Sequence, residues 1–382
     1  MSKYSIIKKY KKENNIKLCS FIIFLRYIKA RLTYRIGVNA FLDNKLYDCK
    51  IDHSEYYSKL HTYIHKWKYC SNKYAFERSK WWLFRHHIQY YVFKILYPGL
   101  DAMDYFRYEF YRLKHKSRKD FITEGYLKKM NNHFNPYKGN EEFYKMLDNK
   151  MSFNTFFNDY LQRKWICIND NKKEIIDFCK EKNTVFAKPI NGGGGVGIEK
   201  FVIKNAEDAG NIFLKYNNKK YILEEAIEQC NQMNKLNGSS INTIRVYSVV
   251  FNDDIHVVGA TLRFGNGKSI VDNYSSGNYA ASIDVITGIV DSTAINQDGE
   301  RISVHPISKC EIVGFKIPCW NETIELVKKA HNKITTLRYI GWDVAINSNN
   351  EVLLIEGNTY AGVELQQHPK LVGKKPLYRQ YW

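Results

Sequence analysis

A run of glycines between two β-branched segments constrains the fold more than any other feature of the 382-residue sequence. The run lies in AKPINGGGGVGIEKF, residues 187–201, where Gly192, Gly194 and Gly197 satisfy the pattern GxGxxG. In a dinucleotide-binding fold such a loop must open a helix, whereas the next residues here, IEKFVI at 198–203, favour a strand. A P-loop is excluded because no Gly-Lys followed by Ser or Thr continues this glycine run. The segment therefore predicts a hairpin with a flexible glycine tip.

The tip of such a hairpin can fold over phosphates, because glycine exposes its backbone N–H groups and adopts the conformations that bring them together. Lys188, at the end of the first strand, would place an ammonium group beside the same phosphates. A long mobile hairpin without a ligand is the plainer alternative.

A second hairpin is predicted near the C-terminus, at residues 341–358, where the sequence reads GWDVAINSNNEVLLIEGN. Its Asn-rich centre is typical of a turn, and pairing of Asn347 with Asn350 sets the predicted register. In that register Asp343 faces Leu354. Strand alternation then puts three oxygen-bearing side chains on one face: Asp343, Glu356 and Asn358.

Oxygen ligands with no His or Cys nearby suit Mg²⁺, which commonly also takes oxygens from substrate phosphates. For any one of these side chains a solvated polar face is the plainer interpretation. The apolar run VLLI at 352–355 favours the metal site for the set, because an unpaired carboxylate on a buried strand would be costly.

The N-terminal and C-terminal parts of the chain differ in their pattern of helix-favouring and strand-favouring residues. Together these patterns predict an α+β fold. Residues 1–140 indicate a mostly helical region, most clearly at 81–97, where apolar residues recur at helical spacing before Pro98. Residues 141–382 indicate a domain of antiparallel hairpins with a helix at 321–338. Its β-branched runs lie at 184–187, 221–223, 244–250 and 352–355.

Positive charge is concentrated in the predicted helical region. Residues 1–140 hold 29 Lys or Arg and 11 Asp or Glu, whereas the rest of the chain holds 29 and 28. Two regions with different partners are implied. The predicted boundary at residue 140 rests on this difference in charge and on the change from a helical to a strand-rich residue pattern. Cations interleaved with Trp and Tyr suit an anionic membrane surface or nucleic acid. A solvated basic surface over an aromatic core is the plainer alternative.

The eight cysteines show no CxxC pair and no framework spacing, which favours free thiols in a reducing compartment. The N-terminus lacks the apolar stretch of a signal peptide, and the apolar run at 21–25 is far shorter than the roughly 20 residues that span a bilayer. We expect a cytoplasmic protein, with peripheral contact at the inner face of the membrane left open.

Taken together, these features resemble the ATP-grasp superfamily. A lysine ahead of a glycine-rich hairpin, the strand end LEE at 223–225, and a later Asp followed by Glu-x-Asn occur in an order similar to that of D-alanine ligase and glutathione synthetase. The amino-acid sequence around these motifs is most similar to that of the sugar-transfer-associated ATP-grasp family, and the resemblance covers roughly residues 100–370. It implies an ATP-grasp fold that uses ATP and Mg²⁺, preceded by the basic, mostly helical region.

The resemblance also implies a role for each matching residue. The nucleotide phosphates would be bound by two lysines and the glycine tip: Lys150, Lys188, Gly192, Gly193, Gly194, Gly195 and Gly197. A hinge would receive adenine through backbone groups and one carboxylate: Glu224, Glu225 and Ile227. Catalysis would fall to Arg245, with Arg263 as a second candidate, and to Lys188. The metal ligands would be Asp343, Glu356 and Asn358, and Asn273 is a candidate substrate contact.

The activity that the resemblance implies is ligation of a carboxylate to an amine. ATP would convert the carboxylate to an acyl phosphate, and the amine would displace phosphate to give an amide. Phosphoryl transfer depends mostly on positioning and charge neutralisation, which these lysines, arginines and Mg²⁺ would supply. We expect sugar-linked substrates in surface polysaccharide or glycoconjugate biosynthesis, and no nucleic acid partner.

The alternative function is a basic nucleic-acid or anionic-membrane binding protein with a degenerate ATP-grasp domain. Its support is the charged and aromatic N-terminal third. Its weakness is that the proposed phosphate- and metal-binding residues are all present, which a degenerate domain need not retain. The identity of the carboxylate and amine and the oligomeric state stay open.

Overall fold

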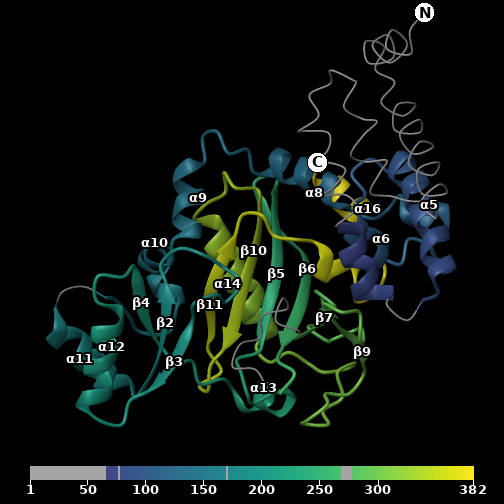
Figure 1. The fold of residues 1–382 in the computed structure, drawn as a ribbon. Coiled ribbons are helices and arrows are strands. Elements are labelled where there is room, and N and C mark those ends of the chain that lie inside the picture. Colours follow the sequence, from purple (N-terminus) through teal and green to yellow (C-terminus); the bar gives the residue numbers. More distant parts are fainter. Residues whose placement is uncertain (1–65, 76–77, 169–170, 268–277) are drawn as a thin grey trace, which may run out of the picture. The chain divides into compact units, whose positions relative to one another are not determined.

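A computed structural model describes residues 66–75, 78–168, 171–267 and 278–382 of the protein and shows two compact units (Figure 1). The first unit comprises Met1–Leu113 and Thr123–Gly125, and the second comprises Lys114–Ile122 and Tyr126–Trp382. This division precedes the boundary at residue 140 that charge and texture predict. The reason is packing, since α8 (Glu124–Phe134) places Leu127, Met130 and Phe134 in an apolar cluster with strand residues of the second unit.

The first unit is helical and aromatic in its described part. A helix at 66–75 is followed by α5 (Lys80–Leu96) and α6 (Ala102–Arg107). Ser79 caps α5 by accepting a hydrogen bond from the Trp82 N–H at 3.1 Å, and the helix ends just before Pro98. The helix predicted at 81–97 is thus confirmed. None of the described helices is both long and apolar enough to cross a lipid bilayer.

The second unit contains a small antiparallel sheet of order β1-β4-β2-β3. Its strands are β1 (Trp165–Cys167), β2 (Thr184–Pro189), β3 (Glu199–Val202) and β4 (Tyr221–Glu225). Two amphipathic helices, α11 (Lys172–Lys182) and α12 (Ala206–Tyr216), lie against one face and bury apolar residues there (Figure 1). The predicted hairpin with a glycine tip is confirmed, because β2 pairs antiparallel with β3 on either side of the glycines.

The larger sheet of the second unit has the order β11-β10-β5-β6-β7-β8-β9 and is antiparallel throughout. Its strands are β5 (Thr243–Phe251), β6 (Asp254–Phe264), β7 (Tyr279–Ile283), β8 (Ala294–Asn296), β9 (Arg301–Ile302), β10 (Tyr339–Ile346) and β11 (Val352–Asn358). The helix predicted at 321–338 appears as α14 (Trp320–Asn332), which packs against one face of the sheet (Figure 1). The strand runs expected from β-branched residues are also confirmed, and the fold is α+β.

Shorter elements complete the second unit. These are α7 (His115–Arg118), α9 (Glu141–Asp148), α10 (Lys150–Phe156), α13 (Asn231–Leu236), α15 (Glu364–Gln367), α16 (Lys375–Tyr378) and the 3₁₀ turns Asn158–Tyr160 and Arg379–Tyr381.

The two faces of the larger sheet are used differently. Alternate residues of β5 and β10, such as Val246 and Trp342, join the main apolar core with α14. On the opposite face, Tyr247 and Tyr339 pack with α8 and the C-terminal segment at one end. Further along that face, the side chains are charged, and this part of the sheet carries most of the predicted catalytic and metal-binding residues.

The C-terminal hairpin differs from its predicted register. Asn347 pairs with Glu351 rather than Asn350, its N–H donating to the Glu351 carbonyl at 3.0 Å, because Asn350 takes a left-handed conformation with φ 61°. The register shifts again between Asp343 and Val344. Asp343 consequently faces Glu356, not Leu354 as predicted. The expected grouping of the carboxylates on one face survives, since the bulge brings them directly opposite each other.

Candidate functional site

Two carboxylates and two arginines meet on the open face of the larger sheet. Strand pairing places Glu356 of β11 opposite Asp343 of β10, and Asp343 opposite Arg245 of β5. Arg245 forms a bidentate pair with Asp343, through Nε to Oδ1 and through Nη2 to Oδ2 at 3.0 Å. Arg263 of β6 reaches the same Oδ2 at 2.7 Å. Four neighbouring strands therefore deliver one compact cluster of alternating charge.

The two carboxylates of this cluster are held in different electrostatic states. Burial alone would raise the pKa of Asp343, but the charges of Arg245 and Arg263 outweigh burial and hold that pKa well below its usual range. The pKa of Glu356 is raised, by burial within the site and by the negative charge of Asp343, against the pull of the two arginines. The Glu356 side chain is 41% exposed, so water screens part of this repulsion. Glu356 is thus the carboxylate with the less complete neutralisation.

The donor set around Glu356 fits a divalent cation. Asn358 donates through Nδ2 to Glu356 Oε1 and to the Gly341 carbonyl, each at 3.3 Å, which leaves its Oδ1 as a ligand atom. Asp343, Glu356 and Asn358 would together offer oxygen donors of the kind that Mg²⁺ prefers. A cation there would also relieve the repulsion between the two carboxylates. Within the described ranges no group of three or more His, Cys, Asp or Glu is arranged to hold a metal. The set around Glu356 instead combines two carboxylates with an amide.

A second buried charge cluster surrounds Glu224 of β4, which is 3% exposed. Its carboxylate pairs with Lys188 Nζ at 2.6 Å and with Arg163 Nε at 3.0 Å, and it accepts a hydrogen bond from Asn154 Nδ2 at 2.8 Å. Burial would raise the pKa of Glu224, but Arg163 and Lys188 hold it well below its usual range. The structure therefore places Glu224 in a saturated network that also holds Lys188.

Lys150, the first residue of α10, lies at the base of the glycine tip. Its backbone N–H donates to the Ile190 carbonyl at 2.9 Å, and its Nζ donates to the Gly192 carbonyl at 2.6 Å. Beyond this anchor the tip is exposed, and its backbone lies in the left-handed region at Gly192, Gly194, Gly195 and Gly197. Side chains would strain that conformation, so the glycines are required to build the tip.

The electrostatics of Lys150 connect the two charge clusters. Burial lowers its pKa, while the charge of Glu356 acts to raise it, Lys188 to lower it and Glu224 to raise it. Residues from β2, β4 and β11 thus act on one ammonium group of α10. The region between the small sheet and the open face of the larger sheet brings together the lysines, arginines and carboxylates predicted for the site.

The predicted adenine hinge lies at the end of β4. The Glu225 carboxylate accepts the Lys164 N–H at 2.9 Å and pairs with Lys182 at 3.3 Å, while Ile227 is half-buried just beyond the strand. The remaining predicted contact, Asn273, lies outside the described residues.

Sequence reasoning missed a buried amide network that positions β5. Asn242, which is 1% exposed, donates through Nδ2 to the Met233 carbonyl at 2.8 Å and to the Asn237 carbonyl at 2.9 Å. Its N–H donates to Gln229 Oε1 at 3.0 Å. Because buried polar groups need partners, this network fixes the start of the strand that carries Arg245. The available signal was an Asn directly before a β-branched run.

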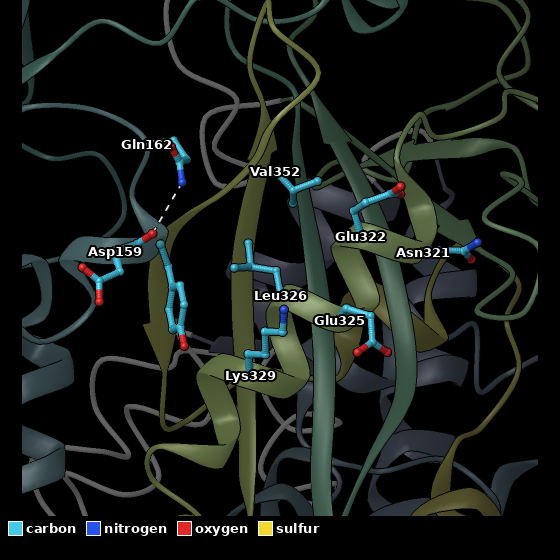
Figure 2. Close-up of a pocket in the computed structure, with 9 residues that line it drawn as sticks. Asp159, Gln162, Asn321, Glu322, Glu325, Leu326, Lys329 and Val352 are labelled. Carbon is cyan, nitrogen blue, oxygen red and sulfur yellow. Dashed lines mark hydrogen bonds between the residues drawn. The ribbon is translucent and has the colours of Figure 1, made fainter.

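A separate open pocket of about 460 Å³ lies beside α14 (Figure 2). None of the predicted site residues lines it. Figure 2 shows Glu322, Glu325 and Lys329 along the helix, with Asp159 and Gln162 on a neighbouring segment, where Gln162 Nε2 donates to the Asp159 carbonyl at 3.4 Å. Its helix is the one that packs against the core face of the sheet, so we assign the candidate site to the open face instead.

Solved structures with a similar fold include two enzymes of D-alanine ligation. D-alanyl-alanine synthetase A from Vibrio cholerae is 12% identical, with 59% of this chain and 61% of that chain covered and a TM-score of 0.36. D-alanine–D-alanine ligase from Helicobacter pylori is 14% identical, with 62% and 61% covered and a TM-score of 0.37. The ATP-grasp ligase PsnB, solved with a phosphomimetic variant of its minimal precursor, Mg and ADP, is 15% identical, with 64% and 60% covered and a TM-score of 0.39.

This chain spans about three fifths of the length of those structures, and the likeness is one of fold. No curated protein matches the sequence. A family model does match: the one described as sugar-transfer associated ATP-grasp covers residues 129–377, which is more than half of the chain. The protein therefore belongs to the sugar-transfer associated ATP-grasp family.

Proposed function

We propose that the protein is an ATP-dependent carboxylate–amine ligase that forms an amide through an acyl phosphate. The observation that carries this proposal is the convergence of Lys150 and Lys188 with Arg245, Arg263 and the two carboxylates described above. A phosphoryl group in transfer spreads negative charge over its oxygens, and a set of fixed cations stabilises that charge without needing a covalent intermediate on the enzyme.

The positions of these residues support a proposed role for each. Lys150 and Lys188, beside the glycine tip, would bind the nucleotide phosphates, and the glycine N–H groups would cover them. Arg245 and Arg263, which reach Asp343 from adjacent strands, would orient the transferred phosphoryl group and the substrate carboxylate. Asp343, Glu356 and Asn358 would hold Mg²⁺, which when bound supplies charge neutralisation for the phosphates. Glu225 and Ile227 would flank the adenine.

The proposed reaction has two balanced steps. The substrate carboxylate oxygen attacks the γ-phosphorus of ATP, and ADP leaves. The amine nitrogen then attacks the acyl carbon, phosphate leaves, and the amine gives up a proton. The family description supports substrates linked to sugar transfer, so we propose an amino sugar or a uronic acid as one partner in surface polysaccharide or glycoconjugate biosynthesis. We propose a cytoplasmic site of action.

The test is nucleotide turnover by the purified full-length chain. Amino acids and uronic acids are offered as carboxylates, sugar nucleotides carrying amino sugars are offered as amines, and ADP is measured with Mg²⁺ present. We expect ADP release that depends on both substrates, with the acyl phosphate trapped by hydroxylamine as a hydroxamate. Release of AMP, or ADP release without hydroxamate formation, would contradict the proposal.

A paired substitution sharpens this test. Glu356→Gln is expected to abolish ADP formation while the protein stays folded, because it removes a metal ligand from a preserved strand. The matched control is Glu351→Gln at the hairpin turn, where the carboxylate accepts a hydrogen bond from Asn347 Nδ2 at 2.8 Å. Full activity of the Glu356 variant would remove this residue from the site.

A further inference from the structure

Helix α5 of the first unit exposes an apolar stripe along its whole length. Trp81 is 72% exposed, Val92 is 41% exposed and Leu96 is 55% exposed. At 100° per residue these positions share one side of the helix with half-buried Ile88 and exposed Arg85. Isolated exposed apolar residues are ordinary on protein surfaces, whereas a stripe that repeats over 17 residues is a surface built to contact something.

The opposite side of α5 is fixed in the core of the first unit. Trp67 stacks on His87 with ring centroids 4.4 Å apart and on Tyr90 at 5.3 Å. Phe93 and Tyr97 are buried on the same side and meet edge to face at 5.8 Å. The helix therefore has an apolar buried side and an apolar exposed side. Because the buried side is held by aromatic packing, rotation of the helix cannot hide the exposed stripe.

Positive charge predominates on α5 and in its unit. The helix sequence, KWWLFRHHIQYYVFKIL, contains no carboxylate, and its only charged residue within the stripe is Arg85. Residues 66–113 carry nine Lys or Arg and four Asp or Glu, and residues 1–140 carry nearly the whole positive excess of the chain. An apolar stripe with Trp at one end and an exposed Arg85 within it, on a segment of net positive charge, matches the interface of an anionic bilayer, where the indole lies at the headgroup level and arginine extends to the phosphates.

We propose that the exposed stripe of α5, made of Trp81, Arg85, Ile88, Val92 and Leu96, docks the protein peripherally on an anionic lipid surface. The helix lies in the plane of the interface and does not span the bilayer. The apolar side chains enter the headgroup boundary, and the surrounding cations add long-range attraction. This inference concerns the first unit alone and does not depend on the proposed ligase activity.

The test is vesicle flotation of the full-length protein without nucleotide. Vesicles of phosphatidylcholine and phosphatidylglycerol in equal amounts are compared with vesicles of phosphatidylcholine alone, each at low and high salt. We expect binding to the anionic vesicles that falls as salt rises, and little binding to the neutral ones. A combined Trp81→Ser, Val92→Ser and Leu96→Ser variant should weaken anionic binding by about tenfold or more.

The matched control changes equally exposed apolar residues of the second unit. Leu214 is 68% exposed and Ile286 is 85% exposed, and the combined Leu214→Ser and Ile286→Ser variant should float as the unchanged protein does. All of these side chains are on the surface, so circular dichroism melting should show that each variant is folded. Arg85→Glu should reduce binding to anionic vesicles through charge alone.

Several results would overturn the proposal. One is absence of flotation with both kinds of vesicle. Another is equal flotation of the stripe variant and the control variant. Salt-sensitive binding to single-stranded or duplex nucleic acid, with no lipid binding, would assign the charge to nucleic acid instead. Self-association that the stripe variant abolishes, again with no lipid binding, would make α5 a contact between copies of the chain.

Discussion

Glu224 and Glu356 are both carboxylates of the candidate site in the second unit, but they differ in how fully neighbouring groups neutralise their charge. Glu224 is contacted by two cations and an amide, and its pKa is pushed well below the usual range. Glu356 lies opposite another carboxylate, its Oε1 is 4.0 Å from Arg245 Nη2, and its pKa is raised.

The difference separates a structural carboxylate from one that can receive a ligand. A buried charge whose partners are all present contributes a fixed position, and its loss leaves those partners uncompensated. A carboxylate that still faces a like charge gains when a cation arrives. On the proposed function, the chain uses the same residue type once to orient Lys188 and once to offer an oxygen to a metal.

The largest expected effect comes from removing Glu224. Glu224→Gln should lower the free energy of unfolding by about 3–5 kcal/mol, because it leaves Arg163 and Lys188 without their buried counter-charge. Urea denaturation followed by circular dichroism measures the loss. The adjacent Glu225→Gln is the control, and as a partly exposed pair it should cost less than about 1 kcal/mol. Equal losses of unfolding free energy from the two variants would show that Glu224 is not held more tightly than its partly exposed neighbour.

The next effect concerns Mg²⁺. Addition of Mg²⁺ with ATP should stabilise the unchanged protein by about 2.7 kcal/mol when the ligand is present at about 100 times its Kd, since it binds the folded state alone. Glu356→Gln should lose most of this stabilisation, whereas Glu351→Gln should keep it. Thermal denaturation with and without Mg²⁺ and ATP provides the measurement. Stabilisation of the Glu356 variant to the full extent would place the cation elsewhere.

The smallest effect is on the pH dependence of the free energy of unfolding, measured without Mg²⁺. The two carboxylates contribute to this dependence with opposite sign. The pKa of Glu224 is lowered on folding, so its stabilisation is present above its unfolded value of about 4.5 and is lost as pH falls below that value. The pKa of Glu356 is raised, so its charge destabilises the fold only as pH rises above about 4.5.

Glu356→Gln should therefore match the unchanged protein at pH 4 and be slightly more stable at pH 8, by less than about 1 kcal/mol after solvent screening. Urea denaturation over this pH series checks the sign. A Glu356 variant that is less stable at pH 8 would show that the repulsion from Asp343 is already compensated in the unliganded protein.

Much of the fold was predictable from local pattern. The glycine hairpin, the helix in the first unit and the principal strands follow from periodicity and from glycine and proline placement. The grouping of Asp343 with Glu356 was also predictable, because strand alternation survives an error in the turn. The exact facing pair was not, because it depends on the left-handed conformation of Asn350 and on a bulge near Asp343, and neither has a strong local signal.

The partners of the carboxylates were beyond sequence reasoning. Glu224 was expected to contribute at the adenine hinge, but its cation Arg163 lies 61 residues away and meets it only through the sheet order. A buried carboxylate predicts that some cation exists without indicating which one. The boundary at residue 140 stays a prediction, because it rests on charge composition, whereas the two compact units follow the packing of residues such as Leu127 and Phe134.

Arg163 also has a mechanical consequence. Besides pairing with Glu224 of β4, it donates through Nη1 to the Leu354 carbonyl of β11 at 2.6 Å. One rigid guanidinium group therefore joins the two sheets at the strand that carries Glu356. Any sliding of the small sheet along the larger sheet would therefore break either this buried ion pair or the hydrogen bond to β11, and either loss would leave a buried polar group without its partner.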